Sequence, residues 1–143
     1  MDRQPSTRGR RRALAGLFAC ALVPAGLRAQ SSVPATIVRF TPGTGGATIN
    51  GQLKGPNDGA RDYVLHAEGG QTLGVRLQTQ SPETYFAVLH PYGDTVYGNE
   101  SDRRTTWSGQ LIDAGDYRVR VYLAREAARQ GRGAAFTLRI DVK

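Results

Sequence analysis

The segment GDYRVRVYLAREAARQGRGAAFTLRIDV, residues 115–142, contains two stretches in which apolar and polar residues alternate. A period of two is typical of a β-strand with one face buried. The apolar positions are Tyr117, Val119, Val121 and Leu123 in the first stretch, and Phe136, Leu138, Ile140 and Val142 in the second. The pattern therefore predicts strands over residues 116–123 and 135–142, with a helix-compatible stretch, residues 123–130, between them.

The same alternation extends toward the N-terminus. Further apolar segments, separated by Gly, Pro, Asn and Asp, cover residues 36–41, 47–53, 62–67, 72–78, 84–90, 94–98 and 105–111. Short strands with turn residues between them are typical of sandwiches and barrels. The sequence predicts an all-β fold, an antiparallel β-sandwich of about eight strands with a short helical turn or loop between the last two.

Three glycine-containing segments predict where the chain turns. EGGQ (residues 68–71) and DAGDY (residues 113–117) place glycine where a hairpin needs positive φ. Asn50-Gly51 is the strongest hairpin dipeptide, but alternation continues through it, so both a turn and a β-bulge remain open.

The first 29 residues resemble an export signal. RGRRR is followed by an apolar run over residues 13–27 and by LRA before Gln30. That run is shorter than the ~18–20 residues that span a bilayer. We expect a signal peptide over residues 1–29, a single sandwich domain over 30–143 without a membrane span, and a periplasmic location. Lipid attachment at Cys20 is disfavoured because bulky Phe18 lies where a lipobox takes a small residue; a twin-arginine route stays open.

Charge and cysteine content exclude several classes. The net charge is +7, but residues 1–29 contribute +5 of it, so the remaining 114 residues carry only +2. That excludes a strongly basic nucleic-acid-binding domain, although Arg118, Arg120 and Arg139 could form a basic row. Cys20 is the only cysteine, so the mature domain must fold without disulfides or cysteine-bound metal.

The chemistry-bearing residues form no catalytic or metal-binding pattern. PGTGGAT (residues 42–48) lacks the Gly-Lys-Ser/Thr of a phosphate loop, and no G-x-S-x-G elbow is present. His66 and His90 are far apart in sequence, and Asp113 and Asp116 flank a turn that needs no ion. We therefore expect no enzyme, no metal and no cofactor.

The run YLAREAARQGRG, residues 122–133, is the one segment with helical spacing. A helix would place Tyr122, Arg125 and Arg129 on one face, and its alanines would let that turn pack closely. One interpretation is a solvated connector. The other is a cationic projection that enters an acidic cleft, because the rigid fork of arginine binds carboxylates through two hydrogen bonds.

Residues 115–131 resemble the signature of periplasmic inhibitors of goose-type (g-type) lysozyme: Gly-Asp-Tyr, then Val-Tyr-Leu, an Arg/Ala/Ala/Arg run and Gly. Residues 62–79 and 84–97 are similar to the middle strands of that family, and the likeness extends over about residues 40–142. The middle strands also resemble pre-peptidase C-terminal domains. Gln130 departs from the pattern, because family members often carry a second arginine there.

The resemblance implies a non-enzymatic, exported β-sandwich that blocks g-type lysozyme by inserting loop residues into its substrate cleft. By motif, Tyr122, Arg125 and Arg129 would be inserted, and loop residues 98–105 would assist. The supporting residues are Asn99, Ser101 and Arg132.

An alternative function is a carbohydrate- or cell-wall-binding module. Aromatic side chains can stack on sugar rings, and the candidates for this role are Tyr85, Tyr92, Tyr97 and Trp107.

Overall fold

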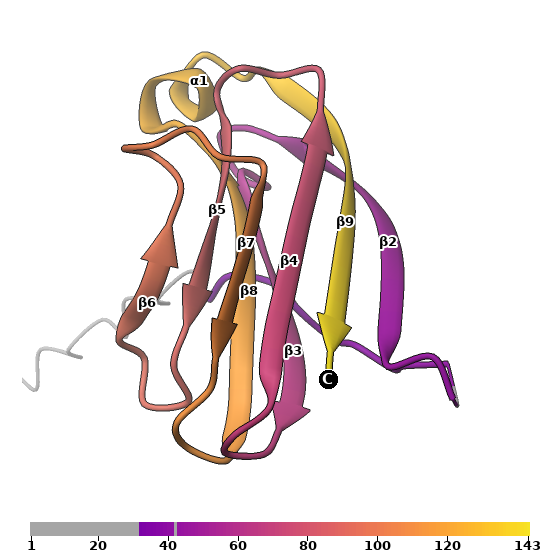
Figure 1. Cartoon of the computed structure of the whole chain (residues 1–143). Helices are drawn as coiled ribbons and strands as arrows, with labels where there is room; N and C mark the ends of the chain where they lie inside the picture. Colours follow the sequence, from indigo (N-terminus) through magenta and orange to yellow (C-terminus); the bar gives the residue numbers. More distant parts are fainter. Residues whose placement is uncertain (1–31, 42) are drawn as a thin grey trace, which may run out of the picture. The chain divides into compact units, whose positions relative to one another are not determined.

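Two β-sheets pack face to face in the part of the chain that the structure, a computed structural model, describes: residues 32–41 and 43–143. The predicted signal peptide lies outside these residues. The strands are β1 (Ala35–Ile37), β2 (Gly46–Lys54), β3 (Ala60–Ala67), β4 (Thr72–Thr79), β5 (Thr84–Leu89), β6 (Thr95–Gly98), β7 (Thr106–Gln110), β8 (Gly115–Leu123) and β9 (Gly133–Val142), with one short helix, α1 (Arg125–Arg129), between β8 and β9 (Figure 1).

Consecutive strands lie in different sheets, except β5 and β6, which pair with each other. One sheet has the order β1-β3-β8-β5-β6 and the other β2-β9-β4-β7. Every strand pair is antiparallel except β1 with β3. The predicted antiparallel β-sandwich, with its helical turn between the last two strands, is confirmed.

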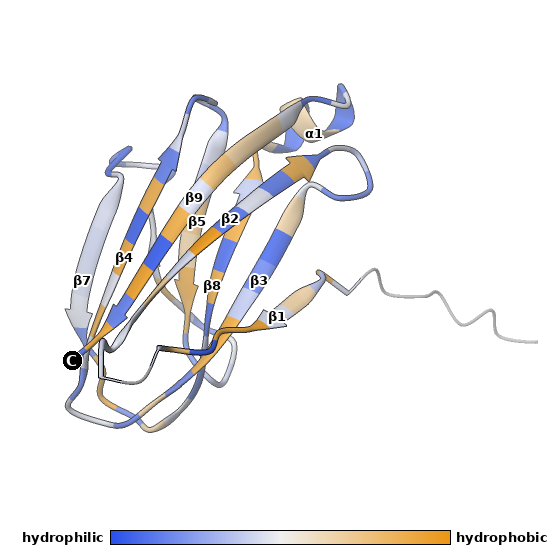
Figure 2. Cartoon of the chain, turned by 90° about the vertical axis from the view of Figure 1, so that its right-hand side faces the viewer, coloured by the Kyte–Doolittle hydropathy of each residue, from blue (hydrophilic) through white to orange (hydrophobic). Residues whose placement is uncertain are grey.

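The core lies between the inner faces of the two sheets. Val119 and Val121 of β8 face Leu138 and Ile140 of β9, and all four are fully buried. Figure 2 shows the corresponding alternation of hydrophobic and hydrophilic bands along β4 and β9. Burial of each such side chain contributes about 1.5–3 kcal/mol, so a core of this kind stabilises the domain without any thiol cross-link.

The glycine turns are confirmed as turns but not as hairpins. Gly70 has φ +90° and Gly115 has φ +149°, as the sequence predicts. However, the first turn joins β3 to β4 and the second joins β7 to β8, which lie in different sheets. Local turn chemistry predicts a reversal of the chain, but it does not determine which strand becomes the hydrogen-bonded partner.

Two other local predictions are wrong. Asn50-Gly51 is neither a hairpin nor a bulge, because β2 pairs with β9 in unbroken register through both residues. Gly51 is needed there because an added Cβ would overlap the ring of Phe136. The first strand spans only three residues, Ala35–Ile37, where residues 36–41 were expected, and lies at a sheet edge.

Candidate functional site

Helix α1 lies at one end of the sandwich, beside the β4–β5 connection (Figure 1). Its inner side is anchored by Ala127, which is fully buried. At its start, the Ala124 N–H donates to the Glu83 carbonyl at 2.7 Å. The small side chains of the Ala/Arg run therefore allow the turn to pack directly on the sheets, as the sequence predicts.

The end of α1 is fixed by backbone hydrogen bonds. The Gly131 N–H donates to the Ala128 carbonyl and the Arg132 N–H to the Ala127 carbonyl, each at 3.0 Å, which is the Schellman pattern. Gly131 has φ +69°, a conformation that favours glycine. The helix thus ends at a defined residue rather than fraying into β9.

The β2–β3 turn supports α1 from its other side. The Gly55 N–H donates to the Arg132 carbonyl at 2.9 Å. A Cβ on Gly55 would overlap the backbone of Ala128, so only glycine allows this approach. Contacts with two separate connections therefore hold a helix of only five residues in place.

Arg125 and Arg129 lie one helical turn apart on α1, and both are exposed. Arg129 lies 3.9 Å from the Glu126 carboxylate, with both side chains more than two-thirds exposed. Such a surface pair contributes only about 0–1 kcal/mol. Within residues 32–41 and 43–143, Arg125 forms no ion pair. The two guanidinium groups are thus presented to solvent from a fixed backbone.

Tyr122 lies on the outer face of β8, at the base of α1. It pairs with Tyr85 of β5, and the two ring centroids are 5.9 Å apart. Burial, followed by the Glu100 carboxylate, raises the pKa of Tyr122 above its usual value of 10.0. The phenol is a hydrogen-bond donor at neutral pH, as any tyrosine with a pKa of about 10 or more is.

Arg103 and Glu100 lie next to the pair formed by Tyr85 and Tyr122. Neither was predicted individually as a site residue from the sequence. The Arg103 guanidinium lies 5.1 Å from the centroid of the Tyr85 ring, a cation–π contact. Both residues are in the predicted assisting loop, residues 98–105. The pairing of Tyr85 with Tyr122 would have pointed to them. That pairing can be recognised only when it is known that β5 and β8 are neighbouring strands.

The three predicted supporting residues differ in what they can offer. Asn99 is only 5% exposed; its amide accepts from the Phe86 N–H and donates to the Arg104 carbonyl. It therefore holds the loop and offers no side chain to a partner in this conformation. Arg132 is bound to Glu83 and braces α1 against the β4–β5 connection. Ser101 is exposed on the assisting loop.

The aromatic residues of the carbohydrate-binding alternative do not form an open platform. Tyr97 and Trp107 stack on each other, with ring centroids 5.5 Å apart and planes at 15°. Tyr85 is only 9% exposed, whereas Tyr92 is 82% exposed. One exposed ring does not make a stacking surface for a polysaccharide.

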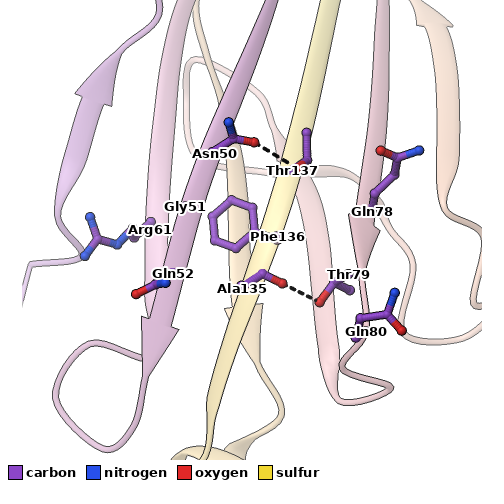
Figure 3. Close-up of a pocket in the computed structure, with 10 residues that line it drawn as sticks. All are labelled: Asn50, Gly51, Gln52, Arg61, Gln78, Thr79, Gln80, Ala135, Phe136 and Thr137. Carbon is purple, nitrogen blue, oxygen red and sulfur yellow. Dashed lines mark hydrogen bonds between the residues drawn. The ribbon is translucent and has the colours of Figure 1, made fainter.

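A hollow of about 710 Å³ lies over β2, β9 and β4 (Figure 3). Its lining is mostly amides and hydroxyls, with Thr137 bonded to Asn50 at 2.9 Å and Thr79 to the Ala135 carbonyl at 2.8 Å. Arg61 is the only charged residue among those that line it. The hollow contains no carboxylate or imidazole, and so no acid–base pair for catalysis.

At the opposite end of the sandwich, both histidines contact carboxylates. His66 lies 2.9 Å from Asp116 and 3.2 Å from Glu68, and His90 lies 2.9 Å from Asp113. In the described part of the chain, no three His, Cys, Asp or Glu side chains converge as metal ligands do.

The basic row considered from the sequence does not form. Arg139 belongs to β9, in the other sheet from Arg118 and Arg120. In addition, Arg120 pairs with Asp62 and Arg139 with Asp141. The outward-facing arginines are therefore divided between two faces, and two of them are neutralised.

Solved structures of periplasmic inhibitors of g-type lysozyme share this fold. The periplasmic inhibitor of g-type lysozyme from Aeromonas hydrophila superimposes with a TM-score of 0.69 at 27% identity, covering 78% of this chain and 97% of that one. A mutant of the Escherichia coli inhibitor gives 0.59 at 25% identity, and the Salmonella Typhimurium inhibitor gives 0.61 at 23%, each covering 78% of this chain and all of the other.

This chain has the fold of the periplasmic g-type lysozyme inhibitors. The resemblance seen in the sequence is thereby confirmed, and the likeness covers 97% or more of each of these inhibitor structures and 78% of this chain. The similar proteins are inhibitors rather than enzymes. No family model and no curated protein sequence matches the chain. Within the described residues, no helix has the length and apolarity needed to cross a membrane.

Proposed function

We propose that the chain is a periplasmic protein inhibitor of g-type lysozyme, without catalytic activity, that inserts α1 into the substrate cleft of the enzyme. The observation that carries this proposal is the fixed helix with Arg125 and Arg129 exposed, on a fold shared with inhibitors of that enzyme. Tyr122 would enter with them as a hydrogen-bond donor.

The chemistry of a glycosidase cleft suits this helix. Such a cleft holds a catalytic carboxylic acid and is shaped for a long polysaccharide. An arginine can bind a carboxylate through two charge-assisted hydrogen bonds. Arg125 and Arg129 would therefore pair with acids in the cleft, while the bulk of α1 and Tyr122 would exclude the glycan.

Preorganisation decides whether this binding is tight. Burial of ion pairs costs desolvation energy, and ordering of a loop costs conformational entropy. Here the backbone of α1 is already fixed by Ala127, Gly55 and the Schellman bonds, so complex formation orders little more than side chains.

The test is inhibition of a purified g-type lysozyme that is clearing a bacterial cell-wall suspension. We expect inhibition by the wild type. The double substitution Arg125→Ala/Arg129→Ala should weaken it by about 1,000-fold, because central arginines at interfaces often contribute about 2 kcal/mol each and about 1.4 kcal/mol corresponds to a tenfold change. The unfolding temperature should stay nearly unchanged, since both side chains are exposed.

The matched control is Arg76→Ala/Arg118→Ala, which removes the same charge from exposed strand positions. It should inhibit like the wild type. A wild-type protein that does not slow the enzyme would refute the proposed function. Equal loss of inhibition in both double variants would show a net-charge effect and refute the role of α1.

A further inference from the structure

A groove of about 570 Å³ lies directly beside α1, on the outer face of the five-stranded sheet. Tyr122 and Arg125 line it, so it adjoins the cluster described above. Residues of β5 and β6 and the segment that precedes β1 complete its walls, among them Val33, Pro34, Leu89 and Thr95.

Small side chains form the floor of the groove. Ala60 and Ala87 lie on either side of β8, paired with Tyr122 and Arg120 respectively. Larger residues at these two outward-facing positions would fill the groove, so its depth depends on the two alanines.

A partly buried ion pair stiffens this floor. Arg120 donates from Nε to Asp62 Oδ1 at 2.7 Å and from Nη2 to Asp62 Oδ2 at 2.9 Å. Asp62 is 3% exposed, and its N–H is bound to the Pro34 carbonyl at 2.9 Å. The pair is neutral overall, so the charge available along the groove comes from Arg125 and Glu100.

Glu100 gives the groove a negative side. It is exposed, lines the groove and lies close enough to Tyr122 to raise the pKa of that phenol. It takes part in no ion pair within the described residues. A partner that presents an acid to Arg125 can therefore present a cationic donor to Glu100 nearby, which is the arrangement that electrostatic complementarity favours.

We infer that this groove is the second half of the inhibitory interface: it receives a protruding segment of the bound lysozyme that carries an apolar side chain and, next to it, a cationic one. This inference rests on the proposed function. If α1 enters a cleft, the rim of that cleft must lie against the surfaces that flank α1, and the groove is the recess that shares Tyr122 and Arg125 with it.

The test fills the groove without changing Tyr122, Arg125 or Arg129. Ala87→Leu and Ala60→Leu should each weaken inhibition of g-type lysozyme by at least about 10-fold, because a filled recess excludes the partner side chain. The matched control is Ala135→Leu, at an outward-facing position of β9 in the other sheet, and it should inhibit like the wild type. Thermal unfolding of all three variants identifies any loss that comes from misfolding.

The charge of the occupant is tested by Glu100→Gln, which keeps the size of the side chain but removes the negative charge. We expect about fivefold weaker inhibition at low salt and a smaller difference at high salt.

The experiments distinguish a failure of this inference from a failure of the proposed function. If the wild type inhibits and Arg125→Ala/Arg129→Ala does not, the function stands. Full inhibition by folded Ala87→Leu and Ala60→Leu would then overturn the groove alone. An unchanged Glu100→Gln variant would overturn the cationic part of the occupant.

Discussion

At the α1 end of the sandwich, Arg125 and Arg129 project from a helix whose inner side is fully buried, whereas at the opposite end His66 and His90 lie against carboxylates of neighbouring turns. Both ends consist of charged, exposed connections. At the far end the charges are used within the chain and hold turns in place. At the α1 end backbone hydrogen bonds fix the helix, so Arg125 and Arg129 remain available to a partner.

The contrast also extends to the arginines. Arg132 is bound to Glu83 and Arg120 to Asp62, and both brace the structure around α1. Arg125 and Arg129 have no comparable partner among the described residues, apart from the long contact of Arg129 with Glu126. All four residues are arginines, so residue type alone does not separate the paired group from the exposed group. The distance of each guanidinium from a carboxylate separates them.

The largest effect on the free energy of unfolding is expected at the support of α1. Gly55→Ala places a methyl group against the backbone of Ala128, so α1 must shift. We expect a loss of about 1–3 kcal/mol in the free energy of unfolding and at least a 10-fold loss of inhibition, measured by denaturation and by cell-wall clearing.

The matched change at the opposite end is Gly70→Ala. Gly70 has φ +90° with no atom near an added Cβ, so alanine there is strained by about 1–2 kcal/mol but touches nothing at α1. Its inhibition should equal that of the wild type. Equal inhibition by Gly55→Ala and Gly70→Ala would show that the support of α1 is no more important for inhibition than the turn at the opposite end.

A medium effect is expected from Tyr117 at the far end. Its hydroxyl donates to the Asp113 carbonyl at 2.8 Å, and the side chain is 1% exposed. Tyr117→Phe should lower the free energy of unfolding by about 1 kcal/mol and leave inhibition unchanged. Tyr92→Phe, at a residue that is 82% exposed, is the control and should change neither quantity. Weakened inhibition in a folded Tyr117→Phe variant would show that the far end takes part in binding.

The smallest effect is a pH dependence at His66. Hydrogen bonds to Asp116 and then to Glu68 raise the pKa of His66 above its usual value of 6.5. The stabilisation is therefore fully present below about pH 6.5 and is lost as the pH rises through the raised pKa of the folded state. Because His66 is exposed, we expect only a small decrease in unfolding temperature between about pH 5 and pH 8.5.

His66→Gln should remove that decrease without changing inhibition at either pH. The measurement is the difference in unfolding temperature between the two pH values, compared for wild type and variant. A variant with the same pH dependence as the wild type would show that other groups cause it.

Local sequence patterns are sufficient to predict the features that depend on neighbours along the chain. The alternation in β8 and β9 predicts two half-buried strands, the Ala/Arg run predicts α1, and the positive-φ glycines predict turns at Gly70 and Gly115. Each follows from local backbone geometry and from which face must be apolar, so a single sequence is enough to read it.

Only the tertiary structure decided which strands pair and which charges meet. It made Asn50-Gly51 the interior of a strand, buried Asn99, bound Arg132 to Glu83 and opened a groove beside Tyr122. These outcomes join residues that are far apart in the chain, such as Asp62 and Arg120. Such contacts depend on which strands pair and on how the two sheets pack, and no local sequence pattern encodes either.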